Sequence, residues 1–304
     1  MMSFFPLTAQ AVMLFALVCA FSRAGLNLID RHQIGHKGLS IIDVNFWNNA
    51  VPAIAMVALA AAVGWHRELV ASLLDVRTML FSGLVQLVAY AYAHAFRRLT
   101  VSQVTVAGKT ADLFIPIGVF FTVGYWDQIT YGFAVATTII CLPLLYRDRR
   151  SQYPGATKAA VVAIGSALVL QASLTPLLAL PGQASQAGQD MPHILTFTTA
   201  VVVWRMVWSA LPFFGRRHDR PPSSLAIVCS PLFLGRVLLS VATQVTFVLA
   251  AGSLNAAVAW PILNSTGMLA MMLSSLLLKE RPSGPETWAV VAITGLALLR
   301  FFSL

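Results

Sequence analysis

Six charged residues lie inside long apolar stretches of the sequence: Arg23, Asp43, Lys109, Asp112, Arg205 and Arg236. A charge at the centre of a bilayer costs about 2.5 to 3.5 kcal/mol even on lenient scales, so such residues are expected to face a cavity or one another. Four of the six are basic and two are acidic. This excess of positive charge predicts a binding site for a carboxylate or phosphate group.

Arg205 and Arg236 are the strongest candidates for direct contact with such an anion. Arg205 lies between Trp204 and Trp208 in the middle of one apolar stretch, and Arg236 lies well inside the next. At these depths a guanidinium group cannot easily snorkel to the lipid headgroups. We therefore expect both arginines, with Trp204 beside them, to line the substrate site.

The other two basic residues each have an alternative explanation that the sequence leaves open. Lys109 and Asp112 are three residues apart in one predicted helix, so they can either pair with each other or line the site. Arg23 and Asn27 are four residues apart, so they can lie on the same face of a helix. Arg23 is also close enough to a predicted helix end to snorkel to the headgroups.

The second apolar stretch begins with an unusually polar turn. Asp43, Trp47 and Asn48 can share one helix face, which predicts either a cavity lining or an anchor at the membrane interface, where tryptophan is common. Asn264 falls close to Lys109 in the repeat alignment given below, so both halves of the chain place polar groups at a similar depth. Hydrogen bonds between helices would give the same pattern.

The remaining polar groups in the apolar stretches are interpreted as packing residues. Gln86 and Gln244 can form hydrogen bonds between helices. Cys19, Cys141 and Cys229 lie in apolar stretches and lack the paired spacing of metal sites or disulfide frameworks. The sequence therefore predicts no metal site and no cofactor.

These side chains must be positioned by helices that cross a membrane. The chain is 58% hydrophobic and 10% charged, whereas a soluble domain has roughly 25% charged residues. Apolar runs such as 80–95 lack the alternating polarity of a membrane barrel. The predicted fold class is an all-α integral membrane protein with about ten transmembrane helices. The predicted spans are 7–29, 41–64, 78–96, 101–123, 127–146, 158–180, 192–214, 225–251, 255–278 and 286–303.

The predicted spans divide into two halves, residues 1–150 and 151–304, with five spans in each. An offset of 155 residues superimposes the fourth and fifth spans on the ninth and tenth without a gap. Each half also has a short hairpin between its third and fourth spans. An odd number of spans per half gives the halves opposite orientations, which is the inverted repeat of many secondary transporters. We expect a central cavity between the two repeats.

The hairpin at 96–102 (Phe-Arg-Arg-Leu-Thr-Val-Ser) and the ending at 276–283 (Leu-Leu-Leu-Lys-Glu-Arg-Pro-Ser) resemble the EamA-like, ten-helix branch of the drug/metabolite transporter superfamily. The resemblance covers essentially the whole chain. It implies two five-helix repeats around a cavity and transport of small metabolites, amino acids or nucleotide-sugar-like anions, often by export, across a bacterial inner membrane. The sequence departs from the family at Tyr125, where the fourth helix usually closes with Glu.

The basic residues between the spans indicate an orientation. Only Arg67, Arg77 and Arg300 lie at the termini or in even-numbered connections. The odd-numbered connections hold Arg31, Lys37, Arg97, Arg98, Arg147, Arg149, Arg150, Lys158, Arg216, Arg217, Arg220, Lys279 and Arg281. The positive-inside rule places the odd connections in the cytoplasm and both termini outside, whereas the family resemblance implies cytoplasmic termini. Such scattered bases do not indicate nucleic-acid binding.

The predicted function is secondary transport by alternating access, as an exporter of a small carboxylate- or phosphate-bearing metabolite such as an amino acid, and not enzymatic catalysis. The sequence has no GxxxxGK(S/T) motif for ATP, so an ion gradient or substrate exchange is the expected energy source, with Asp43 or Asp112 as the proton site if protons are coupled. One alternative is an exporter of aromatic or cationic compounds, with tryptophans as stacking surfaces. Those tryptophans would be Trp47, Trp204, Trp208 and Trp260. The other alternative is a membrane-embedded transferase, whose motifs are missing. The sequence does not predict the oligomeric state.

Overall fold

A computed structural model of the chain describes residues 9–124, 128–146, 155–178, 191–215, 230–251, 262–263 and 265–302. Nearly all of these residues are helical, and none of them is in a β-strand. The α-helices are α1 (Ala9–Asp30), α2 (Ile41–Ala62), α3 (His66–Leu74), α4 (Val76–Phe96), α5 (Val101–Lys109), α6 (Ile115–Val123), α7 (Gln128–Tyr146), α8 (Ala156–Leu178), α9 (Met191–Gly215), α11 (Pro231–Ala251), α13 (Thr266–Leu273) and α14 (Gly284–Phe302). Short helical segments of other types are η1 (Arg31–His36), η2 (Thr110–Leu113) and η5 (Ser274–Leu278).

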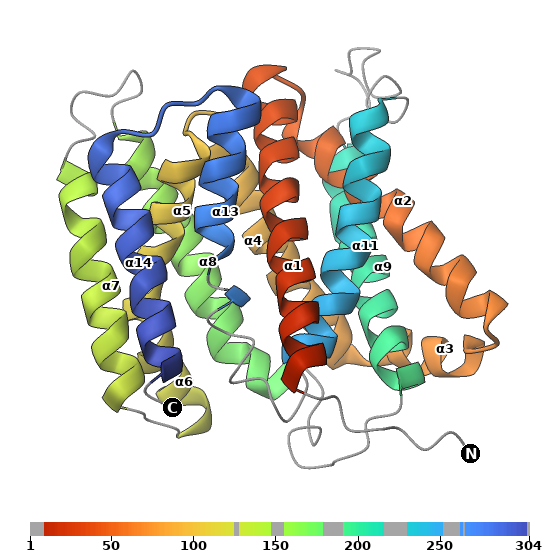
Figure 1. The fold of residues 1–304 in the computed structure, drawn as a ribbon. Helices are drawn as coiled ribbons and strands as arrows, with labels where there is room; N and C mark the ends of the chain where they lie inside the picture. Colours follow the sequence, from red (N-terminus) through yellow and green to blue (C-terminus); the bar gives the residue numbers. More distant parts are fainter. Residues whose placement is uncertain are drawn as a thin grey trace.

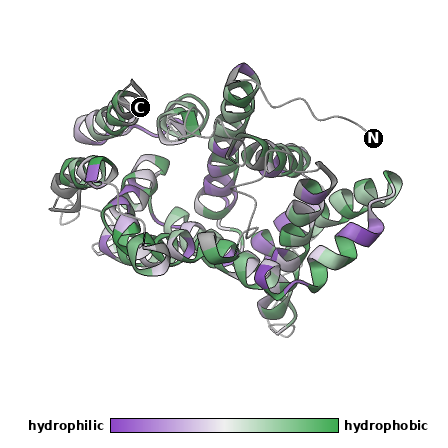
Figure 2. Cartoon of the chain, turned by 90° about the horizontal axis from the view of Figure 1, so that it is seen from below, coloured by the Kyte–Doolittle hydropathy of each residue, from purple (hydrophilic) through white to green (hydrophobic). Residues whose placement is uncertain are grey.

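Several of these helices are long and apolar enough to cross a membrane. Among the described residues there are 5 such helices, or up to 6 if the bent pair α5–α6 forms one span. They coincide with the predicted first, second, third, fourth, sixth and seventh spans. Most helix residues are hydrophobic (Figure 2), and large apolar side chains such as Phe121, Leu276 and Val162 are well exposed on the surface. An outward apolar surface of this kind suits contact with lipid.

Two features differ from the sequence-based expectation. The connection between the second and third predicted spans contains α3, a nine-residue helix, which is not among the predicted helices. The predicted span at 101–123 is bent by 42° at η2. Pro116 explains the bend, because its ring has no N–H and clashes with the carbonyl oxygen of Asp112 one turn earlier.

The hairpin predicted after Arg98 is confirmed as a tight connection. α4 ends at Phe96 and α5 begins at Val101. Thr100 caps α5, because its side chain accepts the Gln103 N–H while the Gln103 side chain accepts the Thr100 N–H. This reciprocal capping satisfies two backbone donors at a helix start. The second predicted hairpin, after Gly252, and the junction between the two predicted halves lie outside the described residues.

The helices pack in pairs that join distant parts of the chain. α1 lies along α11 and also contacts α13, while α8 lies along α4 and also contacts α5 (Figure 1). α2 lies along α9, and α7 contacts α14. The first and last thirds of the sequence are therefore interleaved and do not form separate bundles.

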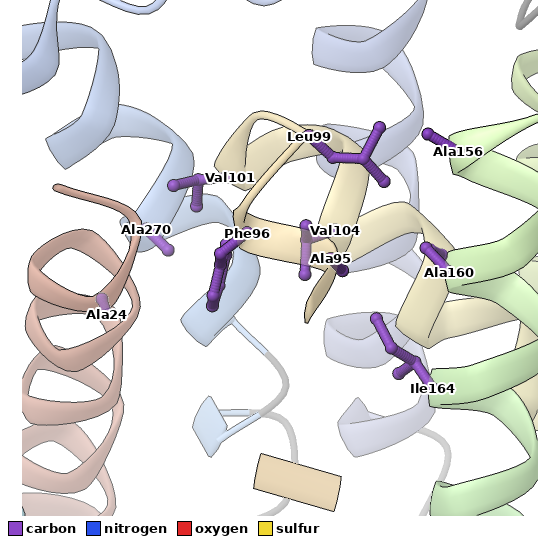
Figure 3. Packing of buried hydrophobic residues seen from close by; sticks show 11 residues of the cluster. Ala24, Ala95, Phe96, Leu99, Val101, Val104, Ala156, Ala160, Ile164 and Ala270 are labelled. Carbon is purple, nitrogen blue, oxygen red and sulfur yellow. The ribbon is translucent and has the colours of Figure 1, made fainter. Parts of the chain in front are cut away.

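The largest buried apolar cluster lies where α1, α4, α5, α8 and α13 meet (Figure 3). It is dominated by small side chains, including Ala24, Ala107 and Ala270, around the larger Phe96 and Ile164. Small residues allow helix backbones to approach closely, which is how helices associate where no water drives them together. This packing fixes the ends of α1 and α4, on which the polar sites depend.

Candidate functional site

A polar cavity lies among α1, α2, α9 and α11. Its empty volume is about 390 Å³, part of it open to solvent. The lining residues are Leu26, Asn48, Asn49, Pro52, Met56, Val202, Arg205, Arg236, Ser240 and Gln244. Three of the predicted site residues, Asn48, Arg205 and Arg236, therefore line the same cavity, although they come from three different helices.

Arg236 is held at the cavity wall by a two-point ion pair. Its Nε lies 2.7 Å from Asp30 Oδ1, and its Nη2 lies 3.0 Å from Asp30 Oδ2. Its Nη1 donates to Ser240 Oγ at 3.2 Å, one turn further along α11. Asn48 Nδ2 donates to the same Asp30 Oδ1 at 3.5 Å. Paired hydrogen bonds of this kind are among the strongest contacts that arginine makes, so Asp30 compensates the charge of Arg236.

Arg205 has a neutral hydrogen-bond partner. Its Nε donates to Gln86 Oε1 at 3.3 Å, and none of the acidic side chains in the described part of the chain pairs with it. The same Gln86 oxygen accepts from Asn49 Nδ2 at 3.1 Å, and Gln86 Nε2 donates to Asn45 Oδ1 at 3.4 Å. Arg205 is thus a half-buried cation that is oriented by amides.

The predicted pair of Lys109 and Asp112 is present. Lys109 Nζ lies 3.5 Å from Asp112 Oδ2, so the explanation that these residues pair with each other is the one that the structure supports. Arg23 lies over the ring of Phe247, with its Cζ 4.4 Å from the ring centroid. Arg23, Lys109 and Asp112 are not among the residues that line the cavity.

The aromatic candidates contact neighbouring helices. Trp204 Nε1 donates to the Leu73 carbonyl oxygen at 2.9 Å, and Trp208 Nε1 donates to Ser82 Oγ at 3.1 Å. Trp47 packs against a cluster that includes Val44 and Phe233. None of these residues lines the cavity.

Of the two remaining acid and amide candidates, Asp43 belongs to the described residues. Asp43 is buried at the start of α2, where its backbone N–H donates to Ser40 Oγ. It is not one of the cavity-lining residues. Asn264 and Trp260 lie outside the described residues.

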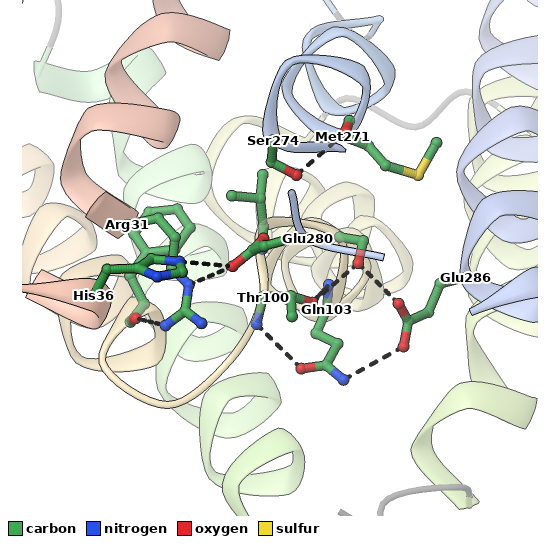
Figure 4. A network of polar contacts seen from close by, with 11 residues as sticks. Arg31, His36, Thr100, Gln103, Met271, Ser274, Glu280 and Glu286 are labelled. Atoms are coloured by element: carbon green, nitrogen blue, oxygen red, sulfur yellow. Dashed lines mark hydrogen bonds and ion pairs between the residues drawn. The ribbon is translucent and has the colours of Figure 1, made fainter. Parts of the chain in front are cut away.

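A second polar network joins the end of α1 to the turn between α4 and α5 and to the loop before α14 (Figure 4). Arg31 Nε lies 2.7 Å from Glu280 Oε1, and Arg31 Nη1 donates to the Phe96 carbonyl oxygen at 2.6 Å. The other Glu280 oxygen accepts the Val101 N–H at 3.1 Å. His36 Nε2 lies 3.5 Å from Glu280 Oε1. Glu280 thereby connects three segments through one carboxylate.

Glu286 extends this network with neutral partners. Its carboxylate accepts from Ser102 Oγ at 2.8 Å, from Gln103 Nε2 at 3.3 Å and from the Ser283 N–H at 3.2 Å. These contacts tie the start of α14 to the start of α5 (Figure 4). The Arg-Leu-Thr-Val-Ser hairpin and the Lys-Glu-Arg-Pro ending, which carry the family resemblance, therefore meet in space.

Sequence reasoning missed Asp30 and Gln86 as site residues. Asp30 falls in the sequence Asp-Arg-His, which is typical of a connection, but α1 continues through Asp30 and directly into η1. Gln86 was interpreted as a packing residue, and it does connect helices, but one of its hydrogen bonds orients Arg205. The spacing of Asp30 from Arg236 carried no indication of their contact, because 206 residues separate them.

The described helices fit a multi-pass membrane protein with a polar cavity among its helices. No protein-family model matches the chain, and no curated protein matches it. A solved structure that is described only as the crystal structure of a protein is similar to it, with a TM-score of 0.61 and 13% sequence identity. The match covers 95% of this chain and 96% of the other. At this identity the likeness shows the fold alone, over the full length of both chains.

Proposed function

We propose that this protein is a secondary carrier for a small metabolite bearing a carboxylate or phosphate group. The observation that carries the proposal is the meeting of Arg205 and Arg236 in one cavity among α1, α2, α9 and α11. Cavities of this kind are the usual sites for small molecules, and intramembrane cations usually serve a function. The excess positive charge favours an anion over the aromatic or cationic substrates of the rival interpretation.

The helix pairing supports a ten-span architecture of two inverted repeats. In the proposed repeat, α1 corresponds to α8, α4 to α11 and α5 to α13. The contact of α1 with α11 then corresponds to that of α8 with α4, and the contact of α1 with α13 to that of α8 with α5. The pairs α2–α9 and α7–α14 are each formed by corresponding helices. Such exchange of partners is expected when two repeats are related by a twofold axis.

Alternating access is the proposed mechanism, and the Arg31–Glu280 network is its proposed closed end. This network joins segments from both repeats, and all of its connections are odd-numbered ones, which the charge bias assigns to the cytoplasm. Asp30 and Arg31 are neighbours in sequence, so the cavity ion pair and this network meet where α1 passes into η1. A bacterial inner membrane is the proposed location, with both termini outside and protons or exchange as the energy source.

The proposal is tested by thermal-shift measurements on detergent-solubilised protein with a panel of carboxylates, phosphates and cations, because a ligand that binds the folded state raises its apparent stability. We expect stabilisation by anions that is lost in R205Q and in R236Q. The matched control is R67Q, since Arg67 is an exposed arginine outside the cavity. Stabilisation by aromatic cations alone, or equal stabilisation of R205Q, R236Q and wild type by anions, contradicts the proposal.

A further inference from the structure

The geometry points to a cavity that selects a singly charged carboxylate, with Asp30 as the residue that sets this selectivity. This inference rests on the proposed carrier function and deepens it, since it names the charge of the substrate. It begins from the three charged groups at the cavity and their different partners. Arg236 is paired with a carboxylate, whereas Arg205 is bound to an amide.

The charge of the site follows from these contacts. The charged members of the cavity lining among the described residues are Arg205 and Arg236. Asp30 binds Arg236 through both carboxylate oxygens, and the two side chains are only 22% and 12% exposed. One guanidinium is therefore neutralised, and the guanidinium of Arg205 is left as the uncompensated charge.

A single carboxylate against Arg205 leaves the cavity neutral. A substrate with two negative charges would leave one of them without a basic partner in the cavity lining, unless it displaced Asp30 from Arg236. Either outcome is unfavourable, because an unpaired buried charge is costly whether it belongs to the substrate or to Asp30. Asp30 thus occupies the place that the second charge of a dianion would need.

Asn48 adds a requirement for a hydrogen-bond donor on the substrate. Its amide orientation is fixed, because Asp30 accepts hydrogen bonds and so must face Asn48 Nδ2. Asn48 Oδ1 then points away from Asp30, and it is buried without a hydrogen-bond partner in the described part of the chain. A buried acceptor of this kind is expected to be satisfied. Asn48 lines the cavity, so a small shift of its side chain on binding would let a hydroxyl group next to the substrate carboxylate supply the missing donor to this buried oxygen.

The test compares three small acids by thermal shift at pH 7: lactate, propionate and malate. Lactate has one carboxylate and a hydroxyl, propionate lacks the hydroxyl, and malate adds a second carboxylate. For wild type we expect lactate to give half-maximal stabilisation at a concentration roughly tenfold lower than malate, because the second carboxylate of malate would lie near the like charge of Asp30, which weakens binding. We expect propionate to be weaker than lactate, since it leaves Asn48 Oδ1 unpaired.

The D30N variant should reverse the preference between lactate and malate, because two uncompensated guanidinium groups then line the cavity. The matched control is E68Q, which removes an exposed acid on α3 and should keep the wild-type preference. The double variant D30N/R236Q restores the wild-type charge and should again prefer lactate, with weaker binding. The wild-type comparison alone decides the inference if D30N does not fold.

Equal or tighter binding of malate by wild type overturns the inference, and so does an unchanged preference in folded D30N. In both cases the carrier proposal survives, because anions still bind through the arginines. If none of the acids in the panel stabilises wild type, including the phosphates tested above, the carrier proposal itself fails and takes this inference with it.

Discussion

Arg31 and Glu280 form an ion pair, with Arg31 Nε 2.7 Å from Glu280 Oε1, although 249 residues separate them in the chain. Their side chains are only 13% and 7% exposed. The pair joins the segment after α1 to the loop before α14, and Val101 at the start of α5 donates its N–H to the same carboxylate. Removing the charge of Glu280 leaves a half-buried guanidinium without its counter-ion, a change that is strongly destabilising for buried pairs.

The first prediction concerns this pair. We expect E280Q to destabilise the protein by about 1 to 3 kcal/mol, since hydrogen bonds to charged groups contribute more than neutral ones. If the network closes one end of an alternating-access cycle, E280Q should also raise the reactivity of a cysteine placed at Ser102 towards a water-soluble maleimide. The measurements are the melting temperature and the labelling rate.

E286Q is the matched control for E280Q. It makes the same acid-to-amide change in the same network, but the partners of Glu286 are Ser102, Gln103 and the Ser283 N–H, which carry no charge. We expect a smaller loss of stability in E286Q than in E280Q. Equal losses would show that charge pairing with Arg31 contributes little to this end of the molecule.

The second prediction concerns the approach of α5 to α4. A Cβ atom on Gly108 would lie 2.5 Å from Tyr92 Oη, which is too close for any real contact. G108A should therefore destabilise the protein by about 1 to 3 kcal/mol, as overpacking does in other cores. In the double variant G108A/Y92F the hydroxyl is absent, so most of the stability should return. Additive effects of the two substitutions in melting temperature would contradict this direct steric conflict.

The third prediction uses Gln86, which orients Arg205. Q86L leaves Arg205 Nε without its Gln86 acceptor, whereas Asn49 Nδ2 keeps the Asn45 carbonyl oxygen as an acceptor. Since Gln86 is only 2% exposed, we expect a loss of about 1 to 3 kcal/mol. Q86E should lose less stability than Q86L, because its carboxylate still accepts from Arg205 and Asn49, although it no longer donates to Asn45 Oδ1. It would also neutralise Arg205.

The two Gln86 variants therefore separate stability from binding. Thermal-shift titration should show that Q86E melts at a higher temperature than Q86L but is no longer stabilised by anions. Anion binding by Q86E with wild-type affinity would show that the charge of Arg205 is not what the substrate contacts.

The fourth prediction separates the Lys109–Asp112 pair from the cavity. The two side chains are 20% and 31% exposed, and partly exposed pairs at this spacing contribute about 1 kcal/mol or less. D112N should therefore change the melting temperature slightly and leave anion binding intact. An exporter of cations that uses Asp112 as counter-charge would instead lose its ligand-induced stabilisation in D112N. The double variant K109Q/D112N serves as the charge-balanced control.

Hydropathy and length were sufficient to predict the helical character of the chain and the positions of the 5 to 6 described helices that are long and apolar enough to cross a membrane. Arg205, Arg236 and Asn48 could also be singled out, because polar side chains in apolar stretches are conspicuous. The bend at η2 was harder to predict, since a proline in an apolar run predicts a kink without its angle.

Asp30 and Glu280 could not be recognised as partners of Arg236 and Arg31. Both acids lie beside basic residues in short polar segments, where charge is ordinary and indicates only a connection between spans. Their roles depend on contacts across more than two hundred residues. Such contacts are set by the order in which helices pack, and a single sequence does not encode that order in any local pattern.

Pro52 gives the cavity a property that no side chain supplies. It lies within α2, one turn after Asn48, and both residues line the cavity. Because proline has no N–H, the main-chain oxygen of Asn48 has no donor at the position where a regular helix would provide one. Pro52 therefore removes one helical hydrogen bond beside the cavity, and replacing Pro52 with alanine would supply the missing N–H to the Asn48 oxygen. Part of the hydrogen-bonding capacity of this stretch of α2 thus belongs to the main chain and does not depend on which side chains line the cavity.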